Sequence, residues 1–278
     1  MAGWGMIVRM NERFAGLVWV AVLAMGAGCA EPTPHNPSFP VTMEEARSAL
    51  REMAVRPAAL RRPVLVIGGY CDPGVSTAYL KHEIRKLTGD DRVVTAVVGF
   101  CQTFDECRQK AIEAVDRAYP NGDPQWTTEV DVIGASLGGL VGRYAAAPSR
   151  DPQHPRRLRI ARLFTIASPH SGAVLTKTAT LTRLQADMRP RSEFLKYVGG
   201  CDAQAGYELF AYARLGDGLV GERYAAPAGQ NPLWVGKAPL EGGHMGAWHD
   251  ARILADIARR LRGERALSTK PAAPLPGG

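Results

Sequence analysis

The 278-residue sequence contains few cysteines, no internal repeat and no apolar run long enough to span a bilayer comfortably. Its five cysteines form no CxxC pair and no cluster with histidine at the spacing of metal ligands. We therefore expect no metal site and no other cofactor. The absence of a repeat argues against a solenoid or an array of small modules, so we expect one main domain.

Charge of one sign is also not concentrated anywhere in the chain. Lys and Arg number 34 against 27 Asp and Glu, a net charge of +7, but the basic residues are spread out and form no nucleic-acid motif. We expect no nucleic-acid partner. A cationic surface favours anionic lipids or cell-envelope polymers, and the simpler alternative is an ordinary solvated surface. With 46% hydrophobic residues, the chain can build a large core.

The N-terminus has the features of an export signal. Arg9 and Arg13 precede an apolar run that ends in small residues directly before Cys29. Residues 1–28 are therefore predicted to be a signal peptide that is removed, with Cys29 as a lipid-modified mature N-terminus of the bacterial lipoprotein type. Ordinary secretion to the periplasm or the medium is the alternative, and Met10 is an alternative start.

Residues 29–62 are predicted to form a Pro-rich tether followed by a short helix. Four prolines between residues 31 and 40 favour a stiff, extended spacer. Thr42 and Glu45 have the spacing of a capping box, which predicts a helix over about 43–55. Without Cys29, four cysteines remain, which permit two disulfides in three connectivities or four free, mostly buried thiols: Cys71, Cys101, Cys107 and Cys201.

From residue 63 onward, strand-like and helix-like segments alternate. This order predicts an α/β fold with a mainly parallel sheet of six strands and helices on both faces. We expect this α/β domain to span 63–265, with an insertion at 172–200 and a disordered tail at 266–278. The predicted strands cover 64–68, 92–99, 130–135, 160–167, 207–214 and 232–235, and the last helix covers 247–262.

The most informative segment is Gly134-Ala135-Ser136-Leu137-Gly138, which follows an apolar strand and precedes a helix. In an open α/β sheet, this pattern raises a serine above the carboxyl end of a strand, and the tight turn requires small residues on both sides. Ser136 is therefore the candidate nucleophile. The alternative is a glycine-rich turn that contains an ordinary serine.

A serine nucleophile needs a histidine base and a carboxylate that orients it. His244 lies on a glycine-rich loop just before the final helix, which favours it over His249, inside that helix's first turn. Asp217 follows a predicted strand and is flanked by glycines, although such a motif also forms plain turns. The weaker acid candidates are Asp187, Asp202 and Asp250.

The oxyanion of the reaction needs backbone N–H donors. One candidate is the amide of Leu137, directly after the serine. The second is the amide of Tyr70, in the loop after the first strand, where Gly69 lets the chain approach a substrate closely. A simple glycine turn at this loop is compatible with the same role.

Three further segments carry a family resemblance: Ser168-Pro169-His170-Ser171-Gly172, Asp217-Gly218-Leu219-Val220, and His244 with its trailing helix. With the elbow, they make residues 63–261 resemble the bacterial lipase/esterase branch of the α/β-hydrolase fold, close to PGAP1-like serine esterases. The resemblance implies that His170 is structural, and that 172–200 is a cap. This cap is either a lid that opens on a lipid interface or a static surface helix.

The sequence therefore predicts a serine carboxylic-ester hydrolase that works through an acyl-enzyme on Ser136. The expected partners are an ester or lipid substrate and a possible membrane interface, and the oligomeric state stays open. An acyltransferase or thioesterase using the same three residues is an alternative, with a peptidase more distant. An inactive, envelope-tethered binding protein is the alternative from another class.

Overall fold

The computed structural model describes residues 34–177, 180–237 and 241–277. The predicted signal peptide and Cys29 lie outside the described residues. Within these ranges, no helix is long and apolar enough to cross a membrane.

Six strands form one sheet in the order β2-β1-β3-β4-β5-β6, and every neighbouring pair is parallel. The predicted fold class is confirmed. The strands are β1 (Val64–Ile67), β2 (Val93–Ala96), β3 (Val130–Ala135), β4 (Ile160–Ile166), β5 (Glu208–Arg214) and β6 (Leu233–Val235). Strand β3 has the predicted bounds, and the other five strands are shorter than predicted by one to four residues.

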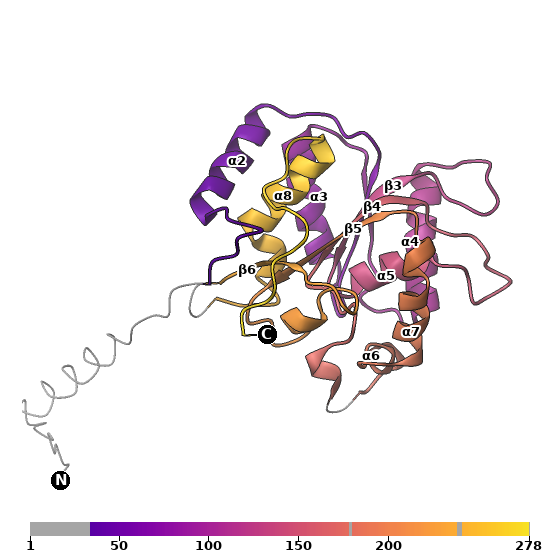
Figure 1. Cartoon of the computed structure of the whole chain (residues 1–278). Helices are drawn as coiled ribbons and strands as arrows, with labels where there is room; N and C mark the ends of the chain where they lie inside the picture. Colours follow the sequence, from indigo (N-terminus) through magenta and orange to yellow (C-terminus); the bar gives the residue numbers. More distant parts are fainter. Residues whose placement is uncertain (1–33, 178–179, 238–240, 278) are drawn as a thin grey trace, which may run out of the picture. The chain divides into compact units, whose positions relative to one another are not determined.

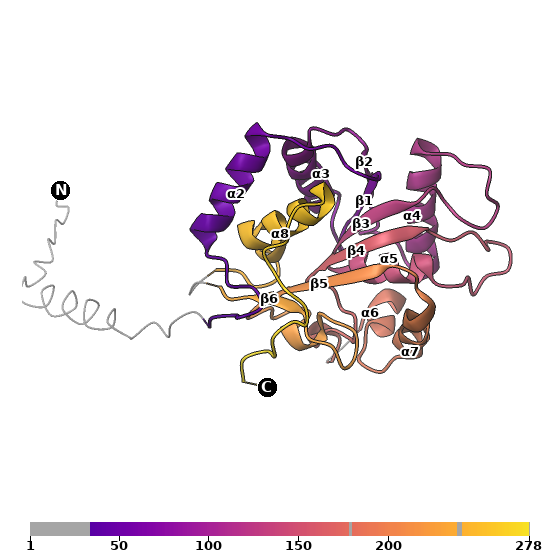
Figure 2. The ribbon, with the colours of Figure 1, turned by 45° about the horizontal axis from the view of Figure 1, so that its top comes forward.

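Helices cover both faces of this sheet (Figures 1 and 2). One face carries α3 (Val75–Thr88) and α8 (Ala251–Arg262), and the other carries α4 (Phe104–Ala118) and α5 (Leu137–Ala146). Alternation along β1 explains the division, because Leu65 packs on the α4 and α5 side while Val66 packs on the α3 and α8 side. The carboxyl ends of the strands therefore meet at one sheet edge, between the two helical layers.

Helix α2 (Met43–Val55) forms an extra layer over α3 and α8. Its start matches the predicted capping box, since the Thr42 Oγ1 accepts the Glu45 amide at 3.2 Å and the Glu45 carboxylate accepts the Thr42 amide at 2.8 Å. Ala46 and Met53 are buried against Ala255 of α8. The helix closes the face of the molecule opposite α4 and α5.

The described part of the Pro-rich stretch is not a free spacer, contrary to the prediction. Asn36 Nδ2 donates to the Trp234 carbonyl of β6 at 2.6 Å, and Phe39 is only 3% exposed. The prolines stiffen a turn that packs on the domain, because Phe39 finds an apolar site beside Tyr212.

The predicted disordered tail is also wrong for residues 266–277. Thr269 donates its amide to the Ser38 carbonyl at 2.8 Å, and Ser38 Oγ accepts the Ala273 amide at 2.9 Å. Trp234 Nε1 donates to the Ala273 carbonyl at 3.1 Å. Proline-rich composition suggested disorder, but the tail has partners in the N-terminal turn and in β6.

Two smaller expectations also need correction. The final helix begins at Ala251, with Asp250 as its N-cap, and the preceding residues form the 3-10 helix η5 (Ala247–His249). Strand β2 covers only four residues of the predicted 92–99; it is the edge strand of the sheet, and Val94 and Thr95 are only half-buried. The four cysteines of the described chain are free thiols, with Cys71 exposed and Cys101 and Cys107 buried.

The insertion between β4 and β5 contains η2 (Val174–Lys177), α6 (Arg183–Asp187) and α7 (Glu193–Gly200). Part of it is anchored in the core, since Phe194 stacks on Phe104 of α4 with ring centroids 4.0 Å apart. Leu184 and Val198 are buried in the same cluster. The turn η2, by contrast, carries the exposed Leu175 at the sheet's carboxyl edge.

Candidate active site

Ser136 lies at the sharp turn between β3 and α5. Its φ of 50° is in the left-handed region, which is strained for a residue with a side chain. The turn is possible because Gly134 and Gly138 lack side chains: a Cβ on Gly134 would overlap the Gly139 backbone, and one on Gly138 would overlap the Ile67 carbonyl. This close packing holds the serine at the end of β3, as the motif predicted.

The structure brings together Ser136, His244 and Asp217. The Ser136 Oγ lies 3.0 Å from the His244 Nε2, although the two residues are 108 positions apart. The His244 Nδ1 lies 2.8 Å from the Asp217 Oδ2. Both bonds are within hydrogen-bond reach, so a hydroxyl, an imidazole and a carboxylate form a continuous chain.

Asp217 is held in a fixed orientation by the chain that follows it. Its Oδ1 accepts the amides of Leu219 and Val220, both at 2.9 Å. Burial alone would raise the pKa of Asp217, but the hydrogen bonds from His244 and from these two amides outweigh it and lower the pKa. Asp217 therefore remains an anion that can orient the imidazole.

The loop that carries His244 packs directly on the loop that carries Asp217. A Cβ on Gly243 would overlap the carbonyl of Gly216, so the second glycine of the Gly242-Gly243 pair is needed for this approach. The ring of Trp248 meets His244 edge-on, with centroids 5.6 Å apart. These contacts fix the base from two sides.

The alternative candidates have other partners. His249 packs on the ring of Tyr79 with centroids 4.2 Å apart, and burial lowers its pKa. Asp202 pairs with Arg143 at 2.6 Å, and Asp250 pairs with Arg252 at 2.7 Å. Asp187 lies in α6, within the insertion.

His170 is buried and serves the structure. Its Nδ1 accepts a hydrogen bond from Arg143 Nη1 at 3.0 Å, and its Nε2 lies 2.7 Å from the Thr165 Oγ1. Burial, together with the Arg143 charge, holds the pKa of His170 well below its usual value. A neutral imidazole here joins α5 to the end of β4.

The predicted oxyanion residues lie around the serine. Gly69 is so close that a Cβ on it would lie 3.4 Å from the Ser136 Cβ, and Tyr70 and Leu137 line the same cavity as Ser136. Among the described hydrogen bonds, neither the Tyr70 nor the Leu137 amide is a donor. Both amides are therefore available to a developing oxyanion.

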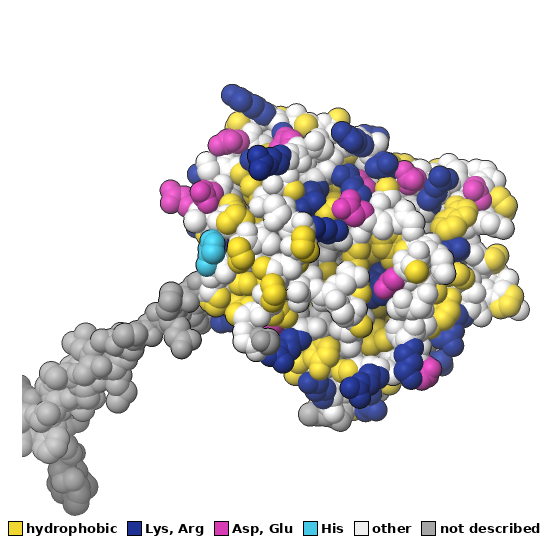
Figure 3. All heavy atoms as spheres, viewed as in Figure 1, with side chains coloured by type: hydrophobic (Ala, Val, Ile, Leu, Met, Phe, Trp, Pro, Cys, Tyr) yellow, Lys and Arg dark blue, Asp and Glu magenta, His cyan; other side chains and the backbone are white. Residues whose placement is uncertain are grey.

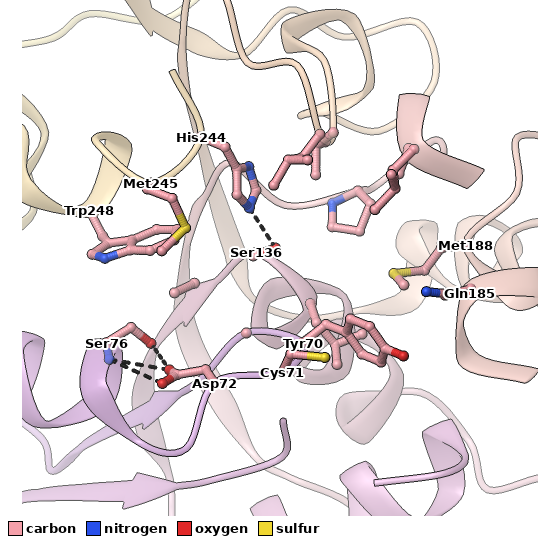
Figure 4. Close-up of a pocket in the computed structure, with 18 of the residues that line it drawn as sticks. Tyr70, Cys71, Asp72, Ser76, Ser136, Gln185, Met188, His244, Met245 and Trp248 are labelled. Carbon is pink, nitrogen blue, oxygen red and sulfur yellow. Dashed lines mark hydrogen bonds between the residues drawn. The ribbon is translucent and has the colours of Figure 1, made fainter. Parts of the chain in front are cut away.

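Asp72, which the sequence analysis did not single out, anchors the loop of Tyr70. Its Oδ1 accepts the amides of Gly74 and Val75 at 2.9 and 2.7 Å, and its carboxylate also binds Ser76, at the start of α3 (Figure 4). An aspartate just before a helix was the available signal. Arg214 and Gly139 were also missed, although Gly139 directly follows the elbow motif.

Ser136 and His244 line a cavity of about 370 Å³ with mostly apolar walls, which we call the apolar cavity. Figure 4 shows Ser136 between two groups of side chains: Met245 and Trp248 on one side, Tyr70 and Met188 on the other. Exposed apolar side chains surround its mouth, namely Val75, Leu175, Leu219 and Met245. Elsewhere, residues 34–177, 180–237 and 241–277 contain no group of three side chains suited to hold a metal ion.

The parallel sheet, the elbow after β3 and the Ser-His-Asp arrangement define a hydrolase-type protein of the α/β class. Residues 91–196 match a family model described as "PGAP1-like alpha/beta domain". This segment includes the elbow and ends before Asp217 and His244. Over residues 91–196, the chain is thus similar to the PGAP1-like alpha/beta domain.

No curated protein matches the chain. A solved protein of Lactobacillus plantarum WCFS1, described as a proposed cell surface hydrolase, is similar in structure, with a TM-score of 0.44 and 16% sequence identity. That similarity covers 75% of this chain and 94% of the other.

Proposed function

We propose that the protein is a serine carboxylic-ester hydrolase that forms an acyl-enzyme on Ser136. The observation that carries this proposal is the hydrogen-bonded chain from Ser136 through His244 to Asp217, with distances of 3.0 and 2.8 Å. This arrangement supplies a nucleophile, a base and an orienting anion beside an apolar cavity.

In the first step, the Ser136 Oγ attacks the carbonyl carbon of the ester while His244 Nε2 takes the hydroxyl proton. Asp217 accepts the Nδ1–H of His244, which fixes the tautomer and stabilises the imidazolium that forms. The carbonyl oxygen becomes an oxyanion and receives hydrogen bonds from the Tyr70 and Leu137 amides.

The tetrahedral intermediate then collapses, and the alcohol leaves with the proton from His244. Water attacks the resulting acyl-enzyme in the same way, again with His244 as the base, and releases the acid. No step uses a metal ion or an organic cofactor.

The shape of the site supports an ester with apolar groups as the substrate. The apolar cavity extends on both sides of Ser136, so an acyl chain and an alcohol portion can lie on opposite sides of the serine (Figure 4). Methionine and aromatic walls adapt to flexible alkyl chains. Esters of medium-chain acids or lipids fit this chemistry.

The decisive experiment compares the wild-type protein with Ser136→Ala on nitrophenyl butyrate. We expect the variant to lose at least about 10³-fold in kcat, because the nucleophile is absent. Ser48→Ala, on the surface of α2, is the matched control and should retain full activity. A fluorophosphonate probe should label the wild type and the control but not Ser136→Ala.

Activity that survives in Ser136→Ala would contradict the proposal. Absence of both turnover and probe labelling in the wild type would favour the inactive binding protein. Acyl transfer is tested in the same assay with an added alcohol: an ester product formed in preference to the free acid would identify an acyltransferase.

We also propose that the protein is exported and carried on a membrane through an acylated Cys29. The sequence before this cysteine supports the proposal. Metabolic labelling with a radioactive fatty acid should mark the wild type and not Cys29→Ala, and labelling of both would contradict it.

A further inference from the structure

A second, larger cleft lies beside the apolar cavity. It has a volume of about 1250 Å³ and runs between the insertion and the 3-10 helix η4 (Glu222–Tyr224). Its walls include Lys177, Arg189, Arg191 and Tyr224. We call it the cationic cleft, and neither the proposed mechanism nor the fold accounts for its charge.

The wall between the two spaces is thin. Thr176, in the turn η2, lines both the apolar cavity and the cationic cleft. The turn is fastened to the loop after Asp217, because Val174 donates its amide to the Val220 carbonyl at 3.0 Å and Leu175 donates to the Leu219 carbonyl at 2.9 Å. At Thr176, the segment η2 is therefore what separates the space around Ser136 from the cationic cleft.

Adjacent residues of the insertion face the two spaces separately. Met188 lines the apolar cavity while the next residue, Arg189, lines the cationic cleft. In Figure 4, Met188 lies with Tyr70 on the side of Ser136 opposite Met245 and Trp248. This side of the apolar cavity is therefore the one that leads toward the cleft.

The cations of the cleft are not neutralised by the protein. Lys177, Arg189 and Arg191 are exposed, and none of them forms an ion pair with another residue of the described chain. Lys177 Nζ lies 5.1 Å from the centre of the Tyr224 ring, which leaves its charge available. Lys196, a fourth cation of the cleft, is paired with Glu193 at 2.7 Å.

Among the described residues that line the cleft, Asp202 is the one acid. Its carboxylate is engaged by the buried guanidinium of Arg143 at 2.6 Å. In Figure 3, Lys and Arg side chains gather along the lower edge of the molecule, where Figure 1 places the insertion. The cleft therefore carries an excess positive charge next to an apolar site.

We propose that the cationic cleft binds a phosphate group carried by the substrate itself, so that the substrate is an amphiphilic ester with an anionic head. This inference rests on the proposed esterase function. Arginine forks and a lysine point charge match phosphate oxygens. The three unpaired cations carry more positive charge than a single substrate carboxylate would neutralise. The volume of the cationic cleft also accommodates a head group larger than a carboxylate.

The test uses two soluble esters that differ only in a phosphate group, hexanoylglycerol and hexanoylglycerol phosphate. Both are used at concentrations at which they are monomers. We expect the full-length wild type to prefer the phosphate ester by about tenfold in kcat/KM, mainly through a lower KM. The double variant Arg189→Ala/Arg191→Ala should lose this preference and keep its activity on hexanoylglycerol.

The matched control is Arg47→Ala/Arg51→Ala, which removes the same charge from the exposed surface of α2. It should keep the preference for the phosphate ester. Raised salt should weaken the preference in the wild type, because the cations are exposed. An equal rate on both esters in the wild type, or an unchanged preference in Arg189→Ala/Arg191→Ala, would overturn the proposal.

Two further arms separate the sources of phosphate. A preference seen only with anionic vesicles, and not with monomers, would show surface docking and overturn a substrate head group. The other alternative is a separate effector site for inorganic phosphate. Equal inhibition of the hydrolysis of both esters, dependent on Arg189 and Arg191, would show such a site and would overturn the substrate head-group proposal too. Absence of nitrophenyl butyrate hydrolysis by the wild type, by contrast, would overturn the esterase function itself.

Discussion

Arg214 donates a hydrogen bond of 2.7 Å from its Nη1 to the carbonyl of Gly242, just before His244. Arg214 is the last residue of β5, and the loop that follows it carries Asp217. Its guanidinium also pairs with Glu241 and, at 3.3 Å, with Asp250. The buried Arg214 side chain therefore fixes the strand that precedes Asp217 relative to the loop that precedes His244.

We expect Arg214→Met to lower kcat/KM by about a hundredfold. The His244 loop would lose the hydrogen bond that holds it, and a small displacement of the catalytic base lowers the rate strongly. The free energy of unfolding should fall by about 3 kcal/mol, since buried carboxylate pairing is lost. Steady-state kinetics on nitrophenyl butyrate and urea unfolding check both effects.

Arg214→Lys is the informative control, because it keeps the charge but loses the planar fork. It should recover stability better than activity. Full activity in Arg214→Met would contradict a positioning role for this arginine.

The pH dependence of stability should report Asp217. Its pKa is lowered below the ordinary value of 3.8, so its contribution to stability is complete above that pH and is lost as the pH falls through the lower, folded-state pKa. Asp217→Asn has no such contribution to lose. We expect the stability difference between wild type and Asp217→Asn to be largest at neutral pH and to shrink below about pH 4, as measured by urea unfolding.

The same variant should also lose activity while it stays folded. Asp217→Asn keeps the shape of the side chain but favours the wrong His244 tautomer, so kcat should fall by about 10³–10⁴-fold. A stability difference that grows on acidification would refute the assignment of the lowered pKa to this carboxylate.

The elbow glycines should tolerate no side chain. In Gly138→Ala, the new Cβ would overlap the Ile67 carbonyl oxygen, which is backbone and cannot move aside. We expect the free energy of unfolding to fall by about 3 kcal/mol. Gly199→Ala in α7 is the matched control, because nothing lies within 4 Å of the added Cβ. Thermal unfolding of both variants should show a large loss for the first and none for the second.

Removal of the tail should destabilise the domain. A chain that ends at Arg265 deprives the buried Asp256 carboxylate of the Leu267 and Ser268 amides, at 2.6 and 2.8 Å. It also removes the carbonyl that accepts the Trp234 Nε1–H. Unfolding free energy should fall by about 3 kcal/mol. A chain shortened only by the last two glycines should be unaffected, and equal stability of all three chains would restore the expectation of a dispensable tail.

The sequence by itself determined the alternation of strands and helices, the position of the elbow and the chain order of Ser136, Asp217 and His244. These features depend on local hydrophobic patterns and on glycines whose spacing follows from one tight turn. It did not determine the ends of the domain. Proline-rich composition suggested a free tether and a disordered tail, whereas Asn36 bonds to Trp234 across 198 residues.

Only the tertiary structure decided how distant segments meet. The hydrogen bond from Arg214 to Gly242 joins the end of β5 to a loop 28 residues further along the chain. The cationic cleft depends on Lys177, Arg189 and Tyr224, which come together because η2 is bonded to the loop after Asp217. Such contacts arise from the packing of whole elements, and no local periodicity in the sequence encodes which side chains face the same space.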